Sequence, residues 1–425
     1  MNSRLARFIL IYAFIMLFAS WIAWEPSAAR DLWLELASAL RSESELFVSE
    51  ERWGDWSVYD LGADVQHIHV IQRDAAGLMW VAADRRLLRF DGRHWVDGKS
   101  QLLEPWPWEI QGLGVTPDAV YVGLTRTGRD GGIGVYDRSA EIWSITLAGE
   151  GQLNWGGIRG IATDAQGTVL LPTAGGTIIQ VNGEQWQERP MPIPFGEDPP
   201  LNHDGLLDPA GRYWLATDRG IWELQSGTWA VHPTPGVVTS LAGDAQGRLW
   251  AGTSAGLLMH DIDDTWYHYP PAAYDTGTSW ISDVAVDAGG RIWVLTRPGL
   301  AIFNGQDWQT ISPQVVGSTH WGETLAFDRQ GQLWVALPDA RIAVFRGQVD
   351  IEPFRVLANP PPMEKLPELQ LSDERPAGQD VRYPDTTIIQ AAALTILFVG
   401  AILGAIRVSI ALRNARTERN DALGI

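Results

Sequence analysis

The sequence predicts an all-β protein, a seven-bladed β-propeller of four-stranded antiparallel blades that is flanked by two transmembrane helices. Two observations carry this prediction. A unit of roughly 42 residues recurs seven times between residues 53 and 352, and a period of this length built from short strands is typical of a propeller. Long apolar runs stand on both sides of the repeats, at residues 8–24 and 386–406.

The first 52 residues are predicted to anchor the chain in a membrane. Residues 1–7 form a short cytoplasmic N-terminus, and residues 8–24 form an uncharged transmembrane helix that acts as a signal anchor. The alternative is a cleaved signal peptide, for which S-A-A at 27–29 is an acceptable cleavage site. Residues 25–52 are expected to be an amphipathic juxtamembrane helix or linker, because apolar residues recur there at helical spacing. They are Leu32, Trp33, Leu36, Ala37 and Leu40.

Residues 53–352 form the propeller, and each repeat has two tryptophan positions. The first ends a Gly-x-apolar-Trp step, which reads G-L-M-W at 77–80, G-R-Y-W at 211–214, G-R-L-W at 247–250, G-R-I-W at 290–293 and G-Q-L-W at 331–334. Two copies are degenerate, D-A-V-Y at 118–121 and G-T-V-L at 167–170. The second tryptophan follows about one hairpin later, at Trp95, Trp143, Trp186, Trp229, Trp266 and Trp308, with Val349 in the seventh copy.

A turn signal precedes the first tryptophan of most repeats. Six units contain Asp-x-x-Gly, beginning at Asp74, Asp164, Asp208, Asp244, Asp287 and Asp328. The Asp side chain accepts backbone hydrogen bonds in a turn, and the Gly supplies the positive φ of a tight hairpin. Further turns divide each unit into four strands, and neighbouring blades must stack because neither face of one blade is buried alone.

The ring is expected to close through the start of the repeat region. Trp56 lies in W-G-D-W-S-V-Y-D at 53–60, which resembles the outer strands G-Q-D-W-Q-T-I at 305–311 and G-T-W-A-V-H at 227–232. We predict that residues 55–60 pair as the outer strand of the last blade, which removes an open edge. Residues 348–353 are the alternative segment.

The repeats resemble the two-component-regulator propeller family, whose consensus runs roughly G-x-L-W-x-G-T-x-x-G-L-x-x-F-x-G-x-x-W. The segment G-R-L-W-A-G-T-S-A-G-L at 247–257 matches it closely, and R-I-W-V-L-T-R-P-G-L at 291–300 followed by Trp308 matches well. In that family the propellers usually form extracytoplasmic sensor regions joined to a cytoplasmic histidine kinase. The present sequence has no kinase, so we expect any signal to pass to a separate protein.

The C-terminal part is predicted to return to the membrane. Residues 353–385 form a Pro-rich stalk, residues 386–406 a second transmembrane helix, and residues 407–425 a short basic cytoplasmic tail. Positive charge flanks both apolar runs on the side of the chain ends, which predicts that both termini are cytoplasmic and the propeller extracytoplasmic. The expected location is the bacterial cytoplasmic (inner) membrane.

The composition excludes one class of partner and several kinds of site. The chain has a net charge of −19 and no cysteine. The two ends carry six arginines and two acidic residues, so residues 25–385 hold about −23. Such a surface repels nucleic acid, which we therefore exclude as a partner. Without cysteine, disulfides, thiolate metal sites and cysteine catalysis are impossible.

The inner strands can be aligned on the Asp of their turns, with Val115 taking this place in the second unit. Residues two apart in a strand share a face, so positions seven and five before that mark are predicted to line the mouth of the central channel. Seven before it stand His67, Trp108, Gly157, Leu201, Val237, Trp280 and Trp321. Five before it stand His69, Ile110, Arg159, His203, Thr239, Ser282 and Glu323.

These positions gather aromatic, imidazole and charged side chains at one rim. Aromatic groups combined with carboxylates and a guanidinium suit a glycan or a peptide, because stacking supplies contact area and polar groups fix orientation. We therefore predict a ligand site formed by His67, His69, Trp108, Arg159, His203, Trp280, Ser282, Trp321 and Glu323. The alternative is that the tryptophans only fill gaps between wedge-shaped blades.

We expect neither a metal nor another cofactor. His67, His69 and His203 could supply three imidazoles to zinc, but they lie on different blades. Virginiamycin B lyase is a seven-bladed propeller with related repeats, and it implies an enzymatic alternative that would use His203, His320 or Glu323 with a metal. The sequence contains no G-x-S-x-G, Walker loop or H-E-x-x-H motif, so we expect no enzyme.

The combined prediction is a membrane-anchored extracytoplasmic propeller that binds a ligand or protein partner as a sensor or scaffold. It would relay or organise through an unidentified membrane or envelope protein. Two alternatives stay open, a structural subunit of a larger envelope complex and a lyase-like propeller enzyme.

Overall fold

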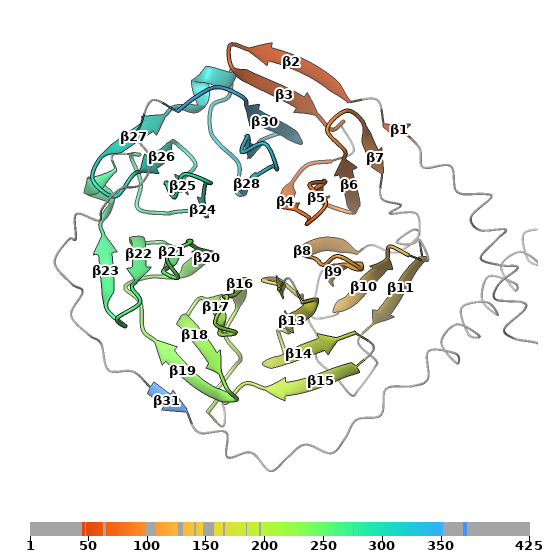
Figure 1. Cartoon of the computed structure of the whole chain (residues 1–425), viewed down its shortest axis with the longest axis vertical. Helices are drawn as coiled ribbons and strands as arrows, with labels where there is room; N and C mark the ends of the chain where they lie inside the picture. Colours follow the sequence, from red (N-terminus) through yellow and green to blue (C-terminus); the bar gives the residue numbers. More distant parts are fainter. Residues whose placement is uncertain are drawn as a thin grey trace, which may run out of the picture. The chain divides into compact units, whose positions relative to one another are not determined.

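The computed structural model describes residues 45–46, 48–62, 65–97, 108–125, 131–139, 142–147, 157–164, 166–183, 185–194, 197–274, 276–349, 351 and 369–371. Seven antiparallel sheets stand around a central channel like the blades of a propeller (Figure 1). The predicted all-β, seven-bladed fold with four-stranded blades is therefore confirmed. None of the helices in these described ranges is long and apolar enough to cross a membrane.

The strands form four concentric layers, each with one strand from every blade. The inner layer contains β4 (Ile68–Arg73), β8 (Glu109–Val115), β12 (Ala162–Thr163), β16 (Asn202–Leu207), β20 (Val238–Gly243), β24 (Asp283–Val286) and β28 (Leu325–Phe327). The second layer contains β5 (Met79–Ala83), β9 (Ala119–Thr125), β13 (Thr168–Pro172), β17 (Tyr213–Thr217), β21 (Leu249–Thr253), β25 (Ile292–Leu295) and β29 (Leu333–Leu337).

The third layer contains β6 (Arg86–Phe90), β10 (Gly131–Asp137), β14 (Thr177–Asn182), β18 (Gly220–Gln225), β22 (Gly256–His260), β26 (Leu300–Phe303) and β30 (Arg341–Phe345). The outer layer contains β7 (Trp95–Asp97), β11 (Ile142–Leu147), β15 (Gln185–Pro190), β19 (Thr228–His232), β23 (Trp266–Tyr269), β27 (Trp308–Ile311) and β3 (Trp56–Asp60). Two short 3-10 helices, η2 (Pro271–Ala273) and η3 (Pro313–Val316), follow β23 and β27.

The repeated Asp and Trp marks contact each other directly. In blade 5, Asp244 Oδ1 accepts hydrogen bonds from the backbone N–H groups of Gln246 and Arg248. Its Oδ2 accepts from Arg248 Nε at 2.6 Å and from Trp250 Nε1 at 2.9 Å. The same Asp–Trp bond, at 2.9–3.1 Å, recurs in five blades. One carboxylate thus holds the turn and also satisfies the indole N–H of a buried tryptophan, which explains the fixed spacing of the two marks.

Apolar side chains of neighbouring blades meet in shared clusters. One cluster joins Trp80 of blade 1 to Trp108, Ile110 and Val122 of blade 2. Another joins Trp293 and Leu295 of blade 6 to the strands of blade 7. A buried tryptophan removes roughly 150–250 Å² from water, so the stacked blades stabilise one another far more than a single blade could stabilise itself.

The N-terminal part of the propeller closes the ring. Strand β3 pairs with β30, with Trp56 opposite Phe345 and Asp60 opposite Arg341. Trp95 and Trp308 occupy the same place opposite Phe90 and Phe303. Trp56 is therefore the outer tryptophan of blade 7. The prediction that residues 55–60 close the last blade is confirmed, and the alternative segment at 348–353 does not take that place.

Three further strands extend outer edges of the ring (Figure 1). β1 (Glu45–Leu46) pairs with β7, β2 (Ser49–Trp53) pairs with β3, and β31 (Leu369–Leu371) pairs with β19. The C-terminal end of residues 25–52, expected to be a helix or linker, is extended at β1 and β2, because the open edges of β7 and β3 offer unpaired backbone groups. Its apolar residues 32–40 lie outside the described residues.

The remaining predicted segments cannot be compared with the structure. The N-terminus at 1–7, the transmembrane helices at 8–24 and 386–406, and the tail at 407–425 all lie outside the described residues. The same holds for the predicted stalk at 353–385, except for the three residues of β31.

Candidate functional site

A β-bulge recurs at the start of four inner strands. The pairing shifts by one residue between Ile68 and Val70 in β4, and likewise in β8, β16 and β20. The extra residues are His69, Gln111, His203 and Thr239. A bulge leaves one residue out of the ladder and re-aims its side chain. For His69, His203 and Thr239 it coincides with the register that the sequence placed at the channel mouth.

The second blade shows that the sequence alignment was wrong by one residue there. Its inner strand ends at Val115, and the hydroxyl of the next residue, Thr116, accepts a hydrogen bond from the backbone N–H of Ala119 at 3.0 Å in the manner of the missing Asp. Trp108 and Ile110 are consequently buried between blades 1 and 2. Glu109 and Gln111 take the predicted places instead, because a shift of one residue moves every side chain to the other face of a strand.

Asp84 holds the two histidines of blade 1. Its Oδ2 accepts backbone hydrogen bonds from Gln66 at 2.5 Å and His67 at 3.2 Å. Its Oδ1 lies 3.5 Å from His67 Nδ1 and 3.8 Å from His69 Nε2, and the two imidazole rings stack with centroids 6.2 Å apart. The sequence reasoning missed Asp84. The usable signal was its place four residues after Trp80, where Asp218 and Ser254 follow Trp214 and Trp250 and bond in the same way.

Arg159 connects blade 3 to blade 2. Its Nε donates to Gln111 Oε1 at 2.8 Å, and Gln111 Nε2 donates to Glu109 Oε2 at 3.2 Å. The guanidinium is exposed at the mouth. Its positive charge acts on both His69 and His203. We call His67, His69, Asp84, Glu109, Gln111, Arg159 and His203 the mouth arc, which extends over blades 1 to 4.

The surroundings of the two central imidazoles of the mouth arc favour their neutral form by lowering the pKa of each. Burial lowers the pKa of His69, against the raising effect of Asp84. Burial and the charge of Arg159 lower the pKa of His203. Within the described part of the chain, the Nε2 atoms of both rings are buried and have no hydrogen-bond partner. A neutral imidazole offers one donor and one acceptor nitrogen, so each ring can serve a ligand that reaches it.

The other predicted site residues divide into two groups. Trp280, 49% exposed, and Ser282 precede β24, and Glu323 precedes β28, where it forms an exposed ion pair with Arg297 at 2.8 Å. Trp321 is fully buried and packs on Trp56 with ring centroids 5.5 Å apart. Its prediction as a rim residue is wrong, because β28 begins only at Leu325 and the strand alternation does not reach residue 321.

A belt of polar side chains lies one position deeper, where inner strands of blades 4 to 7 touch. Asp204 Oδ2 accepts from Leu241 N at 2.8 Å. Ser240 Oγ donates to Asp283 Oδ1 at 2.5 Å, and Asp283 Oδ2 accepts from Leu325 N at 2.9 Å. Burial, and next the carboxylate of Asp283, raise the pKa of Asp204 to about 7. These bonds fix neighbouring blades in register and so hold the mouth rigid.

No group of three or more His, Cys, Asp or Glu side chains among the residues that the structure describes is arranged to hold a metal ion. His203, His320 and Glu323, the residues of the lyase-like alternative, belong to blade 4 and to the connection that leads into blade 7.

Comparison with known proteins identifies the repeat. Residues 233–255 match the family model described as two component regulator propeller, and they cover β20 and β21 of blade 5. The chain therefore carries a repeat of this type in blade 5, where the sequence motif at 247–257 predicted one. No curated protein matches the chain significantly.

Several solved structures share the fold. The extracellular domain of a putative hybrid two component system from B. thetaiotaomicron is 16% identical, with a TM-score of 0.56 over 72% of this chain and 41% of that chain. A streptogramin B lyase is 13% identical, with a TM-score of 0.57 over 72% of this chain and 98% of that chain. YCF48 bound to D1 peptide is 15% identical, with a TM-score of 0.55 over 72% and 100%. At such identities the likeness establishes the propeller fold alone.

Proposed function

We propose that this two-component-regulator-type propeller is an extracytoplasmic sensor or scaffold domain of the bacterial cytoplasmic membrane. Its ligand would bind at the mouth arc, and a separate membrane or envelope protein would receive the signal. The similarity to the extracellular domain of a putative two component system supports the sensor reading. The apolar runs at 8–24 and 386–406 support the membrane location.

The main support for a binding site at the mouth arc is the pair of buried imidazole nitrogens near Arg159 that have no hydrogen-bond partner among the described residues. The exposed guanidinium of Arg159 acts electrostatically on two imidazoles of other blades, and each of these contains one of the two nitrogens. Unpaired buried polar atoms cost free energy, about 1–3 kcal/mol each. A ligand that supplies the missing partners would recover that cost and gain specificity.

The chemistry of the mouth arc favours a ligand with both donors and acceptors. Arg159 and the neutral imidazoles suit hydroxyl, carbonyl or carboxylate oxygens, while Asp84 and Glu109 suit hydroxyl or amide donors. Glycans and peptides offer this mixture. Exposed Trp280 and Leu201 near the same rim add apolar contact area. YCF48, which shares the fold, is described with a bound peptide, and this favours a peptide as one ligand class to test.

The test is a binding screen of the full chain in mild detergent against a glycan array and a short-peptide array. Arg159→Gln and His203→Gln should weaken any ligand found by tenfold or more, because each removes a polar partner. Arg93→Gln is the matched control, since Arg93 is an exposed arginine beside the outer hairpin of blade 1. A ligand that binds Arg159→Gln as tightly as the unchanged chain would reject the mouth arc.

A second candidate function is structural, with the propeller docking another subunit of an envelope complex. The edge pairing of β1, β2 and β31 favours it, because it shows that outer edges of this ring accept additional strands. Affinity purification with mass spectrometry distinguishes the two. A stoichiometric partner that stays bound in Arg159→Gln supports docking, whereas a partner lost with that change supports a ligand-gated relay.

We propose a binding role rather than catalysis. A hydrolysis or elimination activity that requires His203 or Glu323 would overturn this proposal.

A further inference from the structure

A pocket of about 620 Å³ lies between blades 6 and 7. None of the residues that line it belongs to the mouth arc. Strands β24, β28 and β30 run away from the mouth, and the pocket is lined by residues where they end, among them Asp287, Phe327 and Phe345. The mouth residues Ser282 and Glu323 precede the same strands. The pocket therefore opens at the opposite end of the ring.

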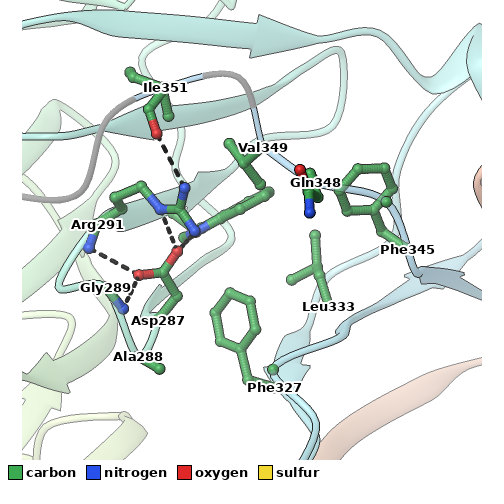
Figure 2. Close-up of a pocket in the computed structure, with 13 residues that line it drawn as sticks. Asp287, Ala288, Gly289, Arg291, Phe327, Leu333, Phe345, Gln348, Val349 and Ile351 are labelled. Atoms are coloured by element: carbon green, nitrogen blue, oxygen red, sulfur yellow. Dashed lines mark hydrogen bonds and ion pairs between the residues drawn. The ribbon is translucent and has the colours of Figure 1, made fainter.

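The walls of the pocket combine aromatic and aliphatic side chains with polar ones, namely Asp287, Arg291 and Gln348. Figure 2 shows Phe327, Leu333 and Val349 pointing into a shared space that Arg291 borders. Trp293 also lines the pocket, and its ring meets that of Phe327 edge-on with centroids 5.6 Å apart. Drug-sized ligands occupy pockets of roughly 300–1,000 Å³ whose walls combine apolar side chains with a small number of polar groups.

The roof of the pocket is the chain that leaves the propeller. We call Arg346, Gly347, Gln348, Val349 and Ile351 the exit segment. At its start, Arg346 N donates to Asp55 O at 2.9 Å. At its end, Ile351 O accepts a hydrogen bond from Arg291 Nη1 at 3.0 Å (Figure 2). The segment contains no strand, because β3 already occupies the outer position of blade 7.

Arg291 connects the pocket floor to this roof. Its Nε donates to Asp287 Oδ2 at 2.6 Å, as Arg248 Nε does to Asp244 in blade 5. A guanidinium has five N–H groups, and these two bonds use two of them. An acceptor group in the pocket can therefore bind Arg291 without displacing either Asp287 or the exit segment.

We propose that this pocket binds a small, flat, apolar molecule that carries one acidic or acceptor group, and that the bound molecule holds the exit segment against blade 6. The flat part would stack on Phe327, whose ring is braced edge-on by the buried Trp293, and the acceptor would take a hydrogen bond from Arg291. Binding of the molecule would then reduce local opening of the exit segment. This site is separate from the proposed mouth ligand and does not depend on it.

The probe for the test is 8-anilinonaphthalene-1-sulfonate, which combines a flat apolar ring system with an acidic group. The full chain in a non-fluorescent detergent should bind it saturably at one site. Val349→Trp should weaken binding tenfold or more, because the indole fills the pocket, and Ala288→Phe is a second filling variant from the other wall. Val315→Trp is the matched control, since Val315 is exposed on η3 and does not line the pocket.

A second pair of variants tests the polar contact. Arg291→Met and Arg248→Met break the same Asp–Arg bond in blades 6 and 5, but only Arg291 lines the pocket. Arg291→Met should lower probe affinity threefold or more and Arg248→Met should leave it unchanged. Bound probe should also slow amide hydrogen exchange in peptides covering residues 346–351.

Three results would overturn the proposal. Equal probe binding by Val349→Trp and the unchanged chain means that the probe sits elsewhere. Equal loss in Val349→Trp and Val315→Trp means binding at exposed apolar surface only. Saturable binding that leaves exchange in the exit segment unaltered rejects the coupling to the outgoing chain.

Discussion

At the scale of single residues, one carboxylate in each of five blades both closes a turn and accepts a hydrogen bond from a buried tryptophan. Asp244 closes the turn through its Oδ1 and satisfies Arg248 and Trp250 through its Oδ2. Blade 3 has the turn without the indole partner, because Leu170 stands where five of the other blades have tryptophan. There Asp164 bonds only to the backbone N–H groups of Gln166 and Thr168.

This difference predicts unequal costs for two matched substitutions. Asp244→Ala leaves a buried indole N–H and a guanidinium without their acceptor, and we expect it to lower the free energy of unfolding by about 3 kcal/mol or more. Asp164→Ala loses turn bonds only and should cost about 1 kcal/mol. Urea unfolding followed by tryptophan fluorescence measures both. Equal midpoints for the two variants would contradict the dual role.

Asp204 predicts a pH dependence. Its pKa is raised from 3.8 to about 7, first by burial and then by Asp283, so the folded state binds this proton more tightly than the unfolded state does. The stabilisation is complete below about pH 4 and is lost as the pH rises through about 7. Asp204→Asn removes this contribution. The unfolding free energy of the unchanged chain minus that of Asp204→Asn should therefore fall across this window, by at most roughly 1.4 kcal/mol per pH unit. A difference independent of pH would refute the shifted pKa.

At the scale of elements, the ring depends on a strand that is distant in sequence from its blade. β3 supplies the outer strand of blade 7, and Trp56 is buried against Trp321 and Phe345. β2 lies outside β3 and exposes Trp53, at 43% of its surface. The two tryptophans of this hairpin therefore have different roles. Trp56 closes the ring, whereas Trp53 belongs to the strand added outside it.

Trp56→Ala should destabilise the propeller by about 3–5 kcal/mol, since it empties a buried aromatic site at the closing contact. Trp53→Ala should cost less than about 1 kcal/mol. Thermal unfolding of the two variants, with limited proteolysis at residues 54–62, measures the effect and its place. If Trp53→Ala destabilises the propeller more than Trp56→Ala does, Trp56 is not the main contact that closes the ring.

The sequence predicted elements best where physical signals repeat. Asp-x-x-Gly turns and paired tryptophans marked the blades, and the resemblance of 53–60 to other outer strands located β3. The rim was harder. Without an Asp in blade 2, the register moved by one residue, so Trp108 was placed at the mouth and Gln111 was missed. Trp321 failed for another reason, because alternation holds only inside a strand and β28 is three residues long.

At the scale of the whole molecule, the two ends of the inner strands carry different chemistry. The mouth arc combines imidazoles, carboxylates and a guanidinium on blades 1 to 4. The pocket at the opposite end of blades 6 and 7 places Phe327 and Val349 beside Asp287 and Arg291, and it lies beneath the exit segment. If the two proposed sites act independently, Val349→Trp should leave the affinity of a mouth ligand unchanged, and Arg159→Gln should leave probe binding in the pocket unchanged.

The predicted orientation of the chain in the membrane, with both termini in the cytoplasm, decides whether the exit segment could lead a signal to the cytoplasm. Arginine follows the apolar run at 386–406 and precedes the run at 8–24, and positive charge stays on the cytoplasmic side of a membrane. Alkaline phosphatase, which folds actively only outside the cytoplasm, should be active when fused after residue 351 and inactive when fused after residue 425. Replacing Arg407, Arg413 and Arg416 by Glu should raise activity at the second junction, because it removes the charge that retains the tail. Activity at residue 425 in the unchanged chain would place the tail outside, and the exit segment could then no longer lead a signal to the cytoplasm.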